Sequence, residues 1–288
     1  MIIKLQGGLG NQMFQYAFSK AIEKHYKKKV LLDKEILLDR TFIPNQYFVF
    51  RDFDLDIFKI DTSFSKPGAE ETFRHQKYSN YLLSGFTRKA YFKEEHLYFN
   101  PAVFNVQGDT YFDGYWQSYR YFENVKDELR QDFSLPVAVN SVGLYKEIKN
   151  NDNAVCINVR RADFLVNAVH GSHSMEYFNT AIEIICAQIS SPSFYIFSDD
   201  VEWCTNNFAL NYPTTIVSYE HKGNKFGNYL KLLSACHHFI IPNSSFAWWG
   251  VWLSNQQNKI VIAPRAWYGE KKLNDQTIDL IPDNWIRI

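Results

Sequence analysis

The fold is decided by one apolar run of six residues, Ala154-Val155-Cys156-Ile157-Asn158-Val159, which stops directly before Arg160. A run of this length suits a strand better than a helix, because helices usually need ten residues or more. Continuous apolar runs are typical of strands that are buried on both faces, and such strands occur in parallel sheets covered by helices. The run therefore predicts a buried strand of an α/β domain.

The sequence that follows this run alternates between strand-like and helix-like segments, as a parallel sheet with crossover helices requires. Ligands of such sheets bind at the carboxyl ends of the strands. Three polar clusters follow expected strand ends: Arg160-Arg161-Ala162-Asp163, Ser198-Asp199-Asp200 and Asn243-Ser244-Ser245. We therefore expect a binding site in this half of the chain. The expected strands are 154–159, 194–197, 215–217, 239–241 and 259–263, and the expected helices are 175–189, 201–207, 228–235 and 246–254.

The preceding half opens with a βαβ pattern around the turn Gly7-Gly8-Leu9-Gly10, and its later part is less regular. Residues 40–100 mix aromatic, basic and acidic residues without periodicity, which indicates irregular structure with short helices. The polar segment 149–153 then separates two expected domains, 1–150 and 151–288. Expected in the first are strands 2–6, 30–33 and 110–113 and helices 11–27 and 121–133.

The composition excludes several classes of protein. The 288 residues include 31 Lys and Arg against 31 Asp and Glu, so the chain has no net charge to attract nucleic acid. The four cysteines form no CxxC pair and are expected to be reduced, buried thiols. No signal-peptide pattern and no membrane-spanning run is visible, so we expect a cytoplasmic protein.

Adjacent arginines at a strand end suit the binding of a phosphate or a carboxylate. Arg160 and Arg161 can each make bidentate hydrogen bonds, although a surface ion pair with Asp163 is the simpler alternative. Ser244 and Ser245 precede an expected helix, where they can cap the helix or present hydroxyl and N–H groups to a phosphate. The two roles can coexist.

Asp199 and Asp200 have three possible roles: they can orient a hydroxyl, cap the next helix or bind a metal. No histidine or third carboxylate lies nearby in the sequence, so no metal is expected.

The first turn is a weak signal for a dinucleotide. Gly8-Leu9-Gly10-Asn11-Gln12-Met13 follows a strand and opens a helix, and Asp33 ends the next strand, as in NAD-binding units. Met13 stands where that motif has its third small residue, which argues against the motif. An NAD-dependent oxidoreductase therefore remains an alternative, beside a loop that merely approaches some ligand closely.

Three residues after the arginine pair are candidates for a general base. His170, His173 and Glu176 lie in the following loop and at the start of the next helix. Loop histidines are more often solvated bystanders. In the first half, Trp116 and Gln117 follow an expected strand and are candidates for contacts to a sugar, with interface packing as the alternative.

Six blocks of sequence then occur in a fixed order along nearly the whole chain. They are Gly7 to Ala17, Asp113 to Ser118, Val159 to Asp163, Ser198 to Asp200, Asn243 to Gly250, and Lys259 to Pro264 with Asp283 to Ile286. Together they resemble the bacterial α-1,2-fucosyltransferases of glycosyltransferase family 11. The resemblance implies a GT-B fold, in which two Rossmann-like domains face each other across a cleft, with the acceptor mainly on the first and GDP-fucose on the second.

The resemblance also implies roles for named residues. Arg160 would neutralise the pyrophosphate as it leaves, Arg161 would support the site and Asp163 would fix the loop. Contacts to the donor would come from the first turn and from the polar clusters of the second half. These donor-binding residues are Gly8, Gly10, Asn11, Gln12, Asn158, Asp199, Asp200, Asn243, Ser244, Ser245 and Phe246. The weaker acceptor candidates are Trp116, Gln117, His170, His173 and Glu176.

The chain departs from the family pattern at three positions. Asn158 and Ala162, beside the arginine pair, stand where the family usually has a histidine and a glycine. Asn228-Tyr229 stands where related enzymes place an acidic residue that binds the nucleotide base. A catalytically silent carbohydrate- or nucleotide-binding protein is therefore a further alternative.

The expected function is inverting transfer of L-fucose to the 2-hydroxyl of a galactoside in surface-polysaccharide synthesis. It would proceed without metal or other cofactor. The expected partners are a sugar nucleotide and an oligosaccharide or glycolipid acceptor, with membrane contact only through the acceptor at the inner face.

Overall fold

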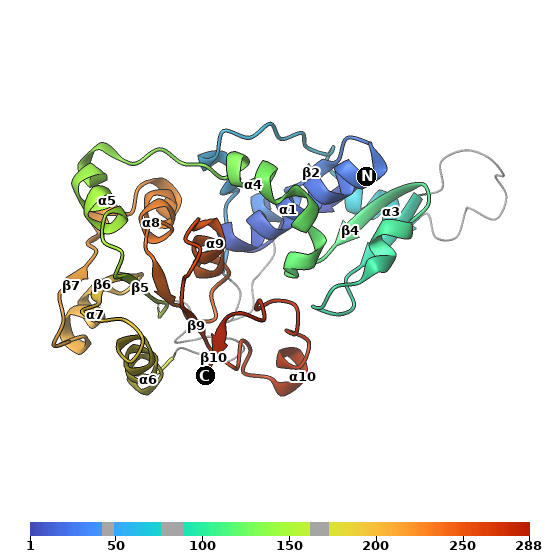
Figure 1. The fold of residues 1–288 in the computed structure, drawn as a ribbon. Coiled ribbons are helices and arrows are strands. Elements are labelled where there is room, and N and C mark those ends of the chain that lie inside the picture. The colour runs from blue at the N-terminus through green and yellow to red at the C-terminus, as the bar shows by residue number, and fades with distance from the viewer. Residues whose placement is uncertain (42–48, 76–88, 162–172) are drawn as a thin grey trace. The chain divides into compact units, whose positions relative to one another are not determined.

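The computed structural model describes residues 1–41, 49–75, 89–161 and 173–288, which form two compact units (Figure 1). Unit 1 comprises Met1–Ser134 and Gln276–Leu280, and unit 2 comprises Leu135–Asp275 and Ile281–Ile288. Each unit has its own parallel sheet covered by helices, which confirms the expected α/β class. None of the helices in the described part of the chain has the length and apolar character needed to cross a membrane.

Unit 1 is built on a parallel sheet of four strands in the order β2-β1-β4-β3. Helix α1 covers one face, where Phe18 meets Phe112 edge-on at 5.4 Å between ring centroids. Helix α3 covers the other face, where Phe73 packs 5.9 Å from Tyr111. Neighbouring residues of a strand point to opposite faces, so Tyr111 and Phe112 anchor the two layers. The elements are β1 (Ile2–Lys4), α1 (Leu9–Tyr26), β2 (Leu31–Asp33), α2 (Glu35–Leu38), α3 (Ala69–His75), β3 (Lys89–Lys93), β4 (Asp109–Asp113) and α4 (Lys126–Asp132).

Two predictions for unit 1 are wrong. Residues 89–93, which lie within the segment interpreted as irregular, form the edge strand β3, paired along its length with β4. Edge strands tolerate lysines, which hides their periodicity. The helix expected at 121–133 is shorter, because residues 119–121 and 123–125 form 3₁₀ turns before α4 begins at Lys126.

Unit 2 contains a parallel sheet of six strands in the order β10-β9-β8-β5-β6-β7. All five expected strands and all four expected helices are present, with ends shifted by up to three residues. The additional strand β10 pairs with β9 at the edge of the sheet. The elements are α5 (Val142–Lys149), β5 (Ala154–Val159), α6 (Met175–Cys186), β6 (Ser193–Ser198), α7 (Val201–Asn207), β7 (Thr214–Ile216), α8 (Gly227–Leu233), β8 (His238–Ile240), α9 (Ser245–Leu253), β9 (Val261–Ala263), α10 (Lys271–Asn274) and β10 (Ile286–Arg287).

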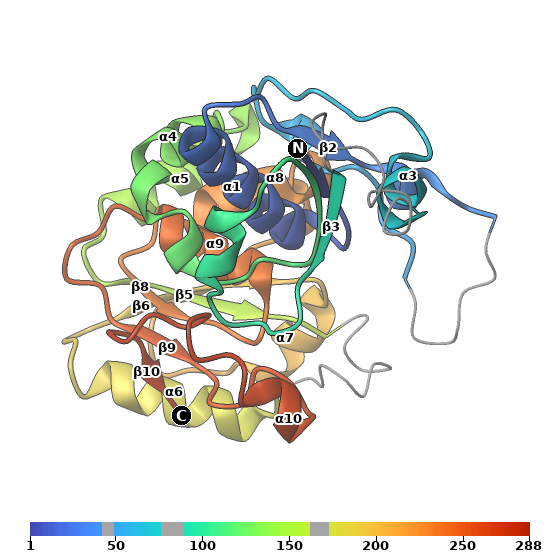
Figure 2. The same ribbon diagram turned by 90° about the vertical axis from the view of Figure 1, so that its right-hand side faces the viewer.

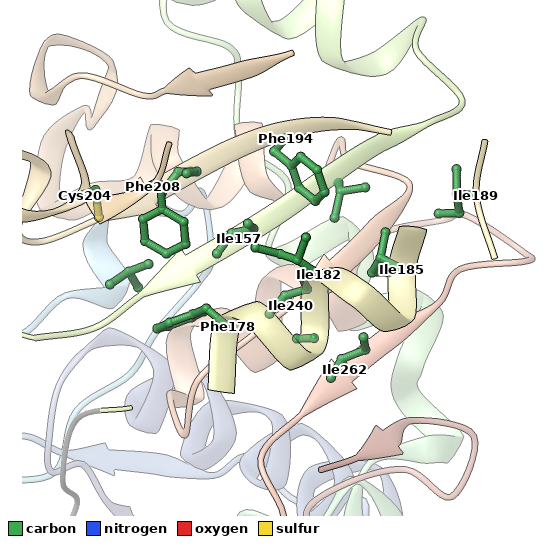
Figure 3. Close-up of a cluster of buried hydrophobic side chains, with 14 residues drawn as sticks. Ile157, Phe178, Ile182, Ile185, Ile189, Phe194, Cys204, Phe208, Ile240 and Ile262 are labelled. Carbon is green, nitrogen blue, oxygen red and sulfur yellow. The ribbon is translucent and has the colours of Figure 1, made fainter. Parts of the chain in front are cut away.

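Strand β5 lies near the middle of this sheet and is buried at every position, as its apolar run predicts. Figure 3 shows Ile182 of α6 directed at the sheet beside Ile157 and Ile240. The opposite face is covered by α8, whose Tyr229 ring lies 5.5 Å from Phe197 of β6. Figure 2 shows α6 and α8 on opposite sides of the strands. Helices on both faces explain why the strand needs no polar face.

The boundary between the units lies at Ser134/Leu135, earlier than the polar segment 149–153 suggests. Residues 135–149 belong to unit 2 because they bond to it: the N–H of Ala138 donates to Asn228 Oδ1 at 3.0 Å, and Tyr195 donates to Glu147 at 2.8 Å. All four cysteines are free thiols, and Cys156, Cys204 and Cys236 are buried as expected, whereas Cys186 is half-buried.

Candidate functional site

The candidate site of unit 2 begins where β5 and β6 end side by side, because Val159 pairs with Ser198 in the sheet. The next residues of the two strands form two ion pairs. Arg160 Nη1 lies 2.8 Å from Asp199 Oδ2, and Arg161 Nε lies 3.2 Å from Asp200 Oδ2. The simple alternative, a pair with Asp163, lies outside the described residues, but the parallel register explains why the Ser-Asp-Asp cluster supplies the partners.

Further contacts fix the second pair. The backbone N–H of Arg161 donates to Asp199 Oδ1 at 2.9 Å, and the guanidinium lies 3.9 Å from the centroid of the Trp203 ring. Asp200 Oδ1 accepts from the N–H of Trp203 at 3.0 Å and so caps α7. Asp199 and Asp200 therefore hold the arginines in place, and the capping role that the sequence allowed for Asp200 is present.

The first pair leaves more of its cation accessible. The Arg160 side chain is 29% exposed, whereas that of Asp199 is 9% exposed. Arg160 is thus a fixed cation at the carboxyl edge of the sheet, which is where an anionic ligand would be met.

The Asn-Ser-Ser cluster lies at the start of α9. Ser244 Oγ accepts from the N–H of Ala247 at 3.4 Å, so Ser244 is the helix cap. Ser245 and Phe246 are the first two helical residues and are half-buried. The buried Asn243 donates to the carbonyl of Trp267 at 3.0 Å. Ser245 is therefore the hydroxyl of this cluster that is best placed for a ligand at the positive end of the helix dipole.

Asn158 and Asn228 have structural partners. Asn158 is buried and its Nδ2 donates to the carbonyl of Phe197 at 3.3 Å. Asn228 Nδ2 donates to Ser141 Oγ at 2.9 Å and to the carbonyl of His221 at 2.6 Å. These departures from the family pattern therefore sit in an intact hydrogen-bonded framework.

The base candidates are separated by the structure. His173 is half-buried; burial lowers its pKa, which a hydrogen bond with Asn243 partly offsets, so the imidazole is neutral near pH 7. Its ring lies 4.5 Å from that of Tyr177, which donates to the carbonyl of Ile241. Glu176 is exposed in the first turn of α6. Asp163 and His170 lie outside the described residues.

Unit 1 brings together Asn11, in the first turn of α1, and Gln117, in the turn that follows β4. Gln117 Nε2 donates to Asn11 Oδ1 at 2.8 Å. Gly7 precedes this site in the left-handed region with φ 77°, and a Cβ there would collide with the Asn11 side chain. Gly8 is the cap of α1, and Gly10 lies in its first turn. The glycine turn thus serves a close approach to Asn11.

The side chain of Gln12 is hydrogen-bonded to other residues of the protein. Its Nε2 donates to the carbonyls of Gly7 and Asp52, both at 2.8 Å, and its Oε1 accepts from the N–H of Asp54 at 2.8 Å. The side chain is fully buried. Gln12 therefore ties the glycine turn to residues 52–54, a function for which the motif gave no signal.

The expectation that the Trp116 ring contacts a sugar is wrong. The residue is 0% exposed, and its ring stacks on Phe18 with centroids 4.3 Å apart and planes 11° apart. Tyr121 packs against it edge-on at 5.8 Å. A ring that is covered by core residues has no face open to a ligand, so Trp116 belongs to the core of unit 1.

Two observations bear on cofactors. Asp33, the residue expected to bind a ribose in the NAD alternative, is buried, accepts from Tyr111 at 2.7 Å and accepts from the N–H of Glu35 at 2.9 Å. Its carboxylate thus has structural partners, which disfavours that alternative. Within the described residues, no group of three His, Cys, Asp or Glu side chains is placed to hold a metal ion.

Comparison with known proteins gives a consistent set of relatives. The sequence model described as Glycosyl transferase family 11 matches residues 1–288. An alpha-1,2-colitosyltransferase of Escherichia coli is 30% identical, covering 100% of this chain and 98% of the relative. The O-antigen biosynthesis glycosyltransferase WbnK of Escherichia coli is 29% identical, covering 99% of both. The galactoside 2-alpha-L-fucosyltransferase SEC1 of Bos taurus is 24% identical, covering 88% of this chain and 64% of the relative.

Proposed function

The chain belongs to glycosyl transferase family 11, and from this membership we propose that it transfers L-fucose from GDP-fucose to the 2-hydroxyl of a galactoside in surface-glycan synthesis. The observation that carries the proposal is the family match over the whole chain, together with two fixed Arg–Asp pairs at adjacent strand ends. The names of the relatives support the 1,2 linkage, the galactoside and the surface glycan.

The proposed reaction is an inverting displacement. The bond between the anomeric carbon and the β-phosphate oxygen breaks, the acceptor oxygen bonds to that carbon from the opposite side, and the hydroxyl proton leaves. Negative charge grows on the departing diphosphate, so donors that are already oriented lower the barrier most. Arg160 is such a donor, because Asp199 holds its guanidinium at 2.8 Å before any ligand arrives.

Arg161 and α9 complete the proposed donor site. Arg161 is fixed between Asp200 and the Trp203 ring, so it supports the geometry of the edge. Ser245 and the first N–H groups of α9 would receive a phosphate at the positive end of the helix dipole. The group that accepts the hydroxyl proton on the attacking side of the sugar is not assigned to a side chain, and the proton passes to solvent.

We propose that no metal or cofactor takes part, because the N–H donors of the two guanidiniums and of the helix start can stabilise the departing diphosphate in its place. An assay with EDTA tests this directly. A metal requirement would appear as activity that EDTA removes and a divalent cation restores.

One specific observation favours a second donor. The relative at 30% identity is named for transfer of colitose, the 3-deoxy analogue of fucose. The linkage and the leaving group of the proposed reaction are the same for both sugars, so the choice of donor depends on contacts to the sugar 3-position.

The decisive experiment is release of GDP by the purified protein in EDTA. GDP-fucose, GDP-colitose, GDP-mannose and UDP-galactose are compared, first without acceptor and then with a panel of galactosides. Release from GDP-fucose that a galactoside accelerates supports the proposal, and faster release from GDP-colitose replaces fucose by colitose. Stabilisation by GDP without release from any donor would identify the silent binding protein instead.

A further inference from the structure

Glu94 joins two segments of unit 1 that the sequence leaves far apart. It follows β3 directly, and its carboxylate accepts the N–H of Tyr115 at Oε2 (2.6 Å) and that of Trp116 at Oε1 (3.1 Å). Its own N–H donates to the carbonyl of Asp113 at 2.8 Å. Glu94 therefore fastens the end of β3 to the turn that follows β4, which comprises residues 114–117.

The turn needs this fastening because its backbone is unusual. Trp116 has φ 55°, a left-handed conformation that costs free energy in a residue other than glycine. Gly114 lies against the Glu94 side chain so closely that a Cβ would stand 2.5 Å from Glu94 Cβ and 2.7 Å from Oε2. The carboxylate and the turn are therefore built around each other.

The turn carries polar and aromatic groups at the carboxyl edge of the sheet. Gln117 reaches Asn11 at 2.8 Å, which joins the turn to the glycine turn after β1. Tyr115 is 38% exposed, beside the buried Trp116. Amide groups bind sugar hydroxyls and an exposed aromatic ring can lie against a sugar face, so this edge suits a carbohydrate.

We propose that Glu94 is a positioning residue for the acceptor: its carboxylate holds residues 114–117 so that the exposed Tyr115, and Asn11 fixed by the buried Gln117, meet the acceptor sugar. The proposal rests on the proposed function, because it assumes that unit 1 binds a galactoside. It assigns no contact between Glu94 and the reacting atoms.

The charge state of this carboxylate changes in an accessible pH range. Burial raises the pKa of Glu94 to about 7, against the two N–H bonds that lower it, and the charge of Asp113 raises it further. Tyr115 and Tyr121 also face it; partial burial and nearby carboxylates raise the pKa of Tyr115, and burial raises that of Tyr121, so both stay neutral. With a pKa of about 7, roughly nine-tenths of the carboxylate is charged at pH 8 and roughly one-tenth at pH 6.

The test compares wild type with Glu94→Gln, using Glu95→Gln as the matched control, since Glu95 is exposed and adjacent. Hydrogen exchange of residues 115–117, corrected for the intrinsic pH dependence, is measured at pH 8 and pH 6. We expect residues 115–117 to exchange faster in E94Q than in wild type at both pH values, because a glutamine side chain offers one acceptor oxygen in place of two. Unchanged protection in E94Q would overturn the proposal.

The second readout is kinetic and uses the galactoside that accelerates GDP release most. The acceptor KM of E94Q should be about tenfold higher than that of wild type at both pH values, the effect of losing about 1.4 kcal/mol from one hydrogen bond to a charged group. The donor KM should stay within about twofold throughout, because Arg160, Arg161 and Ser245, which the proposed function assigns to the donor diphosphate, lie in unit 2. Faster exchange with an unchanged acceptor KM would overturn the positioning role. The hydrogen-exchange measurement needs no sugar donor. Failure of the proposed function would instead appear as no GDP release by wild type, so the two failures can be told apart. In that case, a titration with lactose measures acceptor binding directly.

Discussion

Arg160 is the residue on which the proposed chemistry depends most directly. Arg160→Ala should lower kcat by about a hundredfold or more, because removal of one fixed donor to developing negative charge typically costs 10²–10³. The melting temperature should fall moderately, because the 9% exposed Asp199 carboxylate loses its cation but keeps the hydrogen bond from the N–H of Arg161. Steady-state GDP release measures the effect, with the exposed Lys272→Ala as control. A variant that keeps more than about a tenth of the activity, less than 1.4 kcal/mol of transition-state loss, contradicts the assigned role.

Trp116 and Tyr115 are neighbours with opposite environments, which makes them a matched pair. Trp116→Ala should lower the free energy of unfolding by about 3–5 kcal/mol, because it empties a packed core position. Tyr115→Ala should cost much less stability and raise the acceptor KM. Urea unfolding and acceptor kinetics separate the two effects. Equal stability of the two variants would refute the core assignment of Trp116.

The pKa of Glu94 also predicts a pH dependence of stability. Burial raises that pKa in the folded state above its ordinary value, so the folded protein binds the proton more tightly than the unfolded chain. The stability that this proton contributes is present at low pH and is lost as the pH rises to about 7. The slope is at most about 1.4 kcal/mol per pH unit. Urea unfolding from pH 5 to 8 should show the slope in wild type and a flatter one in E94Q; identical slopes would exclude Glu94 as its source.

The positions of candidate site residues can be predicted from the sequence where these residues follow the end of a recognisable strand. Arg160, Asp200 and Ser244 follow recognisable apolar runs, so their place at the sheet edge could be inferred before the structure. Glu94 could not be found this way, because its partners lie more than twenty residues away and meet it only through the pairing of β3 with β4. Trp116 was misjudged because nothing in its local sequence shows that Phe18 covers its ring.

At the level of elements, the glycine turn before α1 has a conformational requirement that can be tested. Gly7→Ala should destabilise the protein by more than about 1 kcal/mol, since φ is positive there and a Cβ meets Asn11. Gly143→Ala is the matched control, because this helical glycine has open space around its Cα. The control should be neutral or stabilising by up to about 1 kcal/mol. Thermal unfolding of both variants decides; similar destabilisation by both would contradict the argument.

The elements of the two units differ in how well the sequence predicts them. In unit 2 the central strand is buried on both faces, so its apolar run carries a strong signal. In unit 1 the edge strand β3, Lys89-Ala90-Tyr91-Phe92-Lys93, has a lysine at each end and no alternation, and its pairing with β4 rather than its own pattern makes it a strand. The hydrophobic pattern of a sequence therefore predicts buried strands well and edge strands poorly. Edge strands carry charged residues that prevent pairing with other chains, and these residues interrupt the pattern.

At the scale of the whole molecule, the chain passes from one unit to the other three times. It leaves unit 1 after Ser134, returns for Gln276–Leu280 and ends in unit 2. The returning segment is bonded within unit 1: the N–H of Phe99 donates to Asp279 at 2.7 Å, and that of Leu97 donates to Gln276 at 3.2 Å. Short-range sequence patterns contain no signal for such a return, which explains why two contiguous domains were expected.

Because the chain crosses between the units at Leu280/Ile281, we predict that substitutions of two residues close in sequence affect different units. Asp279→Ala removes the acceptor of Phe99 and should cost about 1.5–3 kcal/mol, raising hydrogen exchange around residues 97–100. Trp285→Ala removes a buried ring that packs 6.0 Å from Trp248, and should raise exchange in α9 and β9. Asp275→Ala, which breaks only an exposed pair with Lys271, is the control and should change neither region. If both substitutions instead raised exchange equally in both sheets, the units would unfold as one cooperative body, and the returning segment would be the connection that couples them.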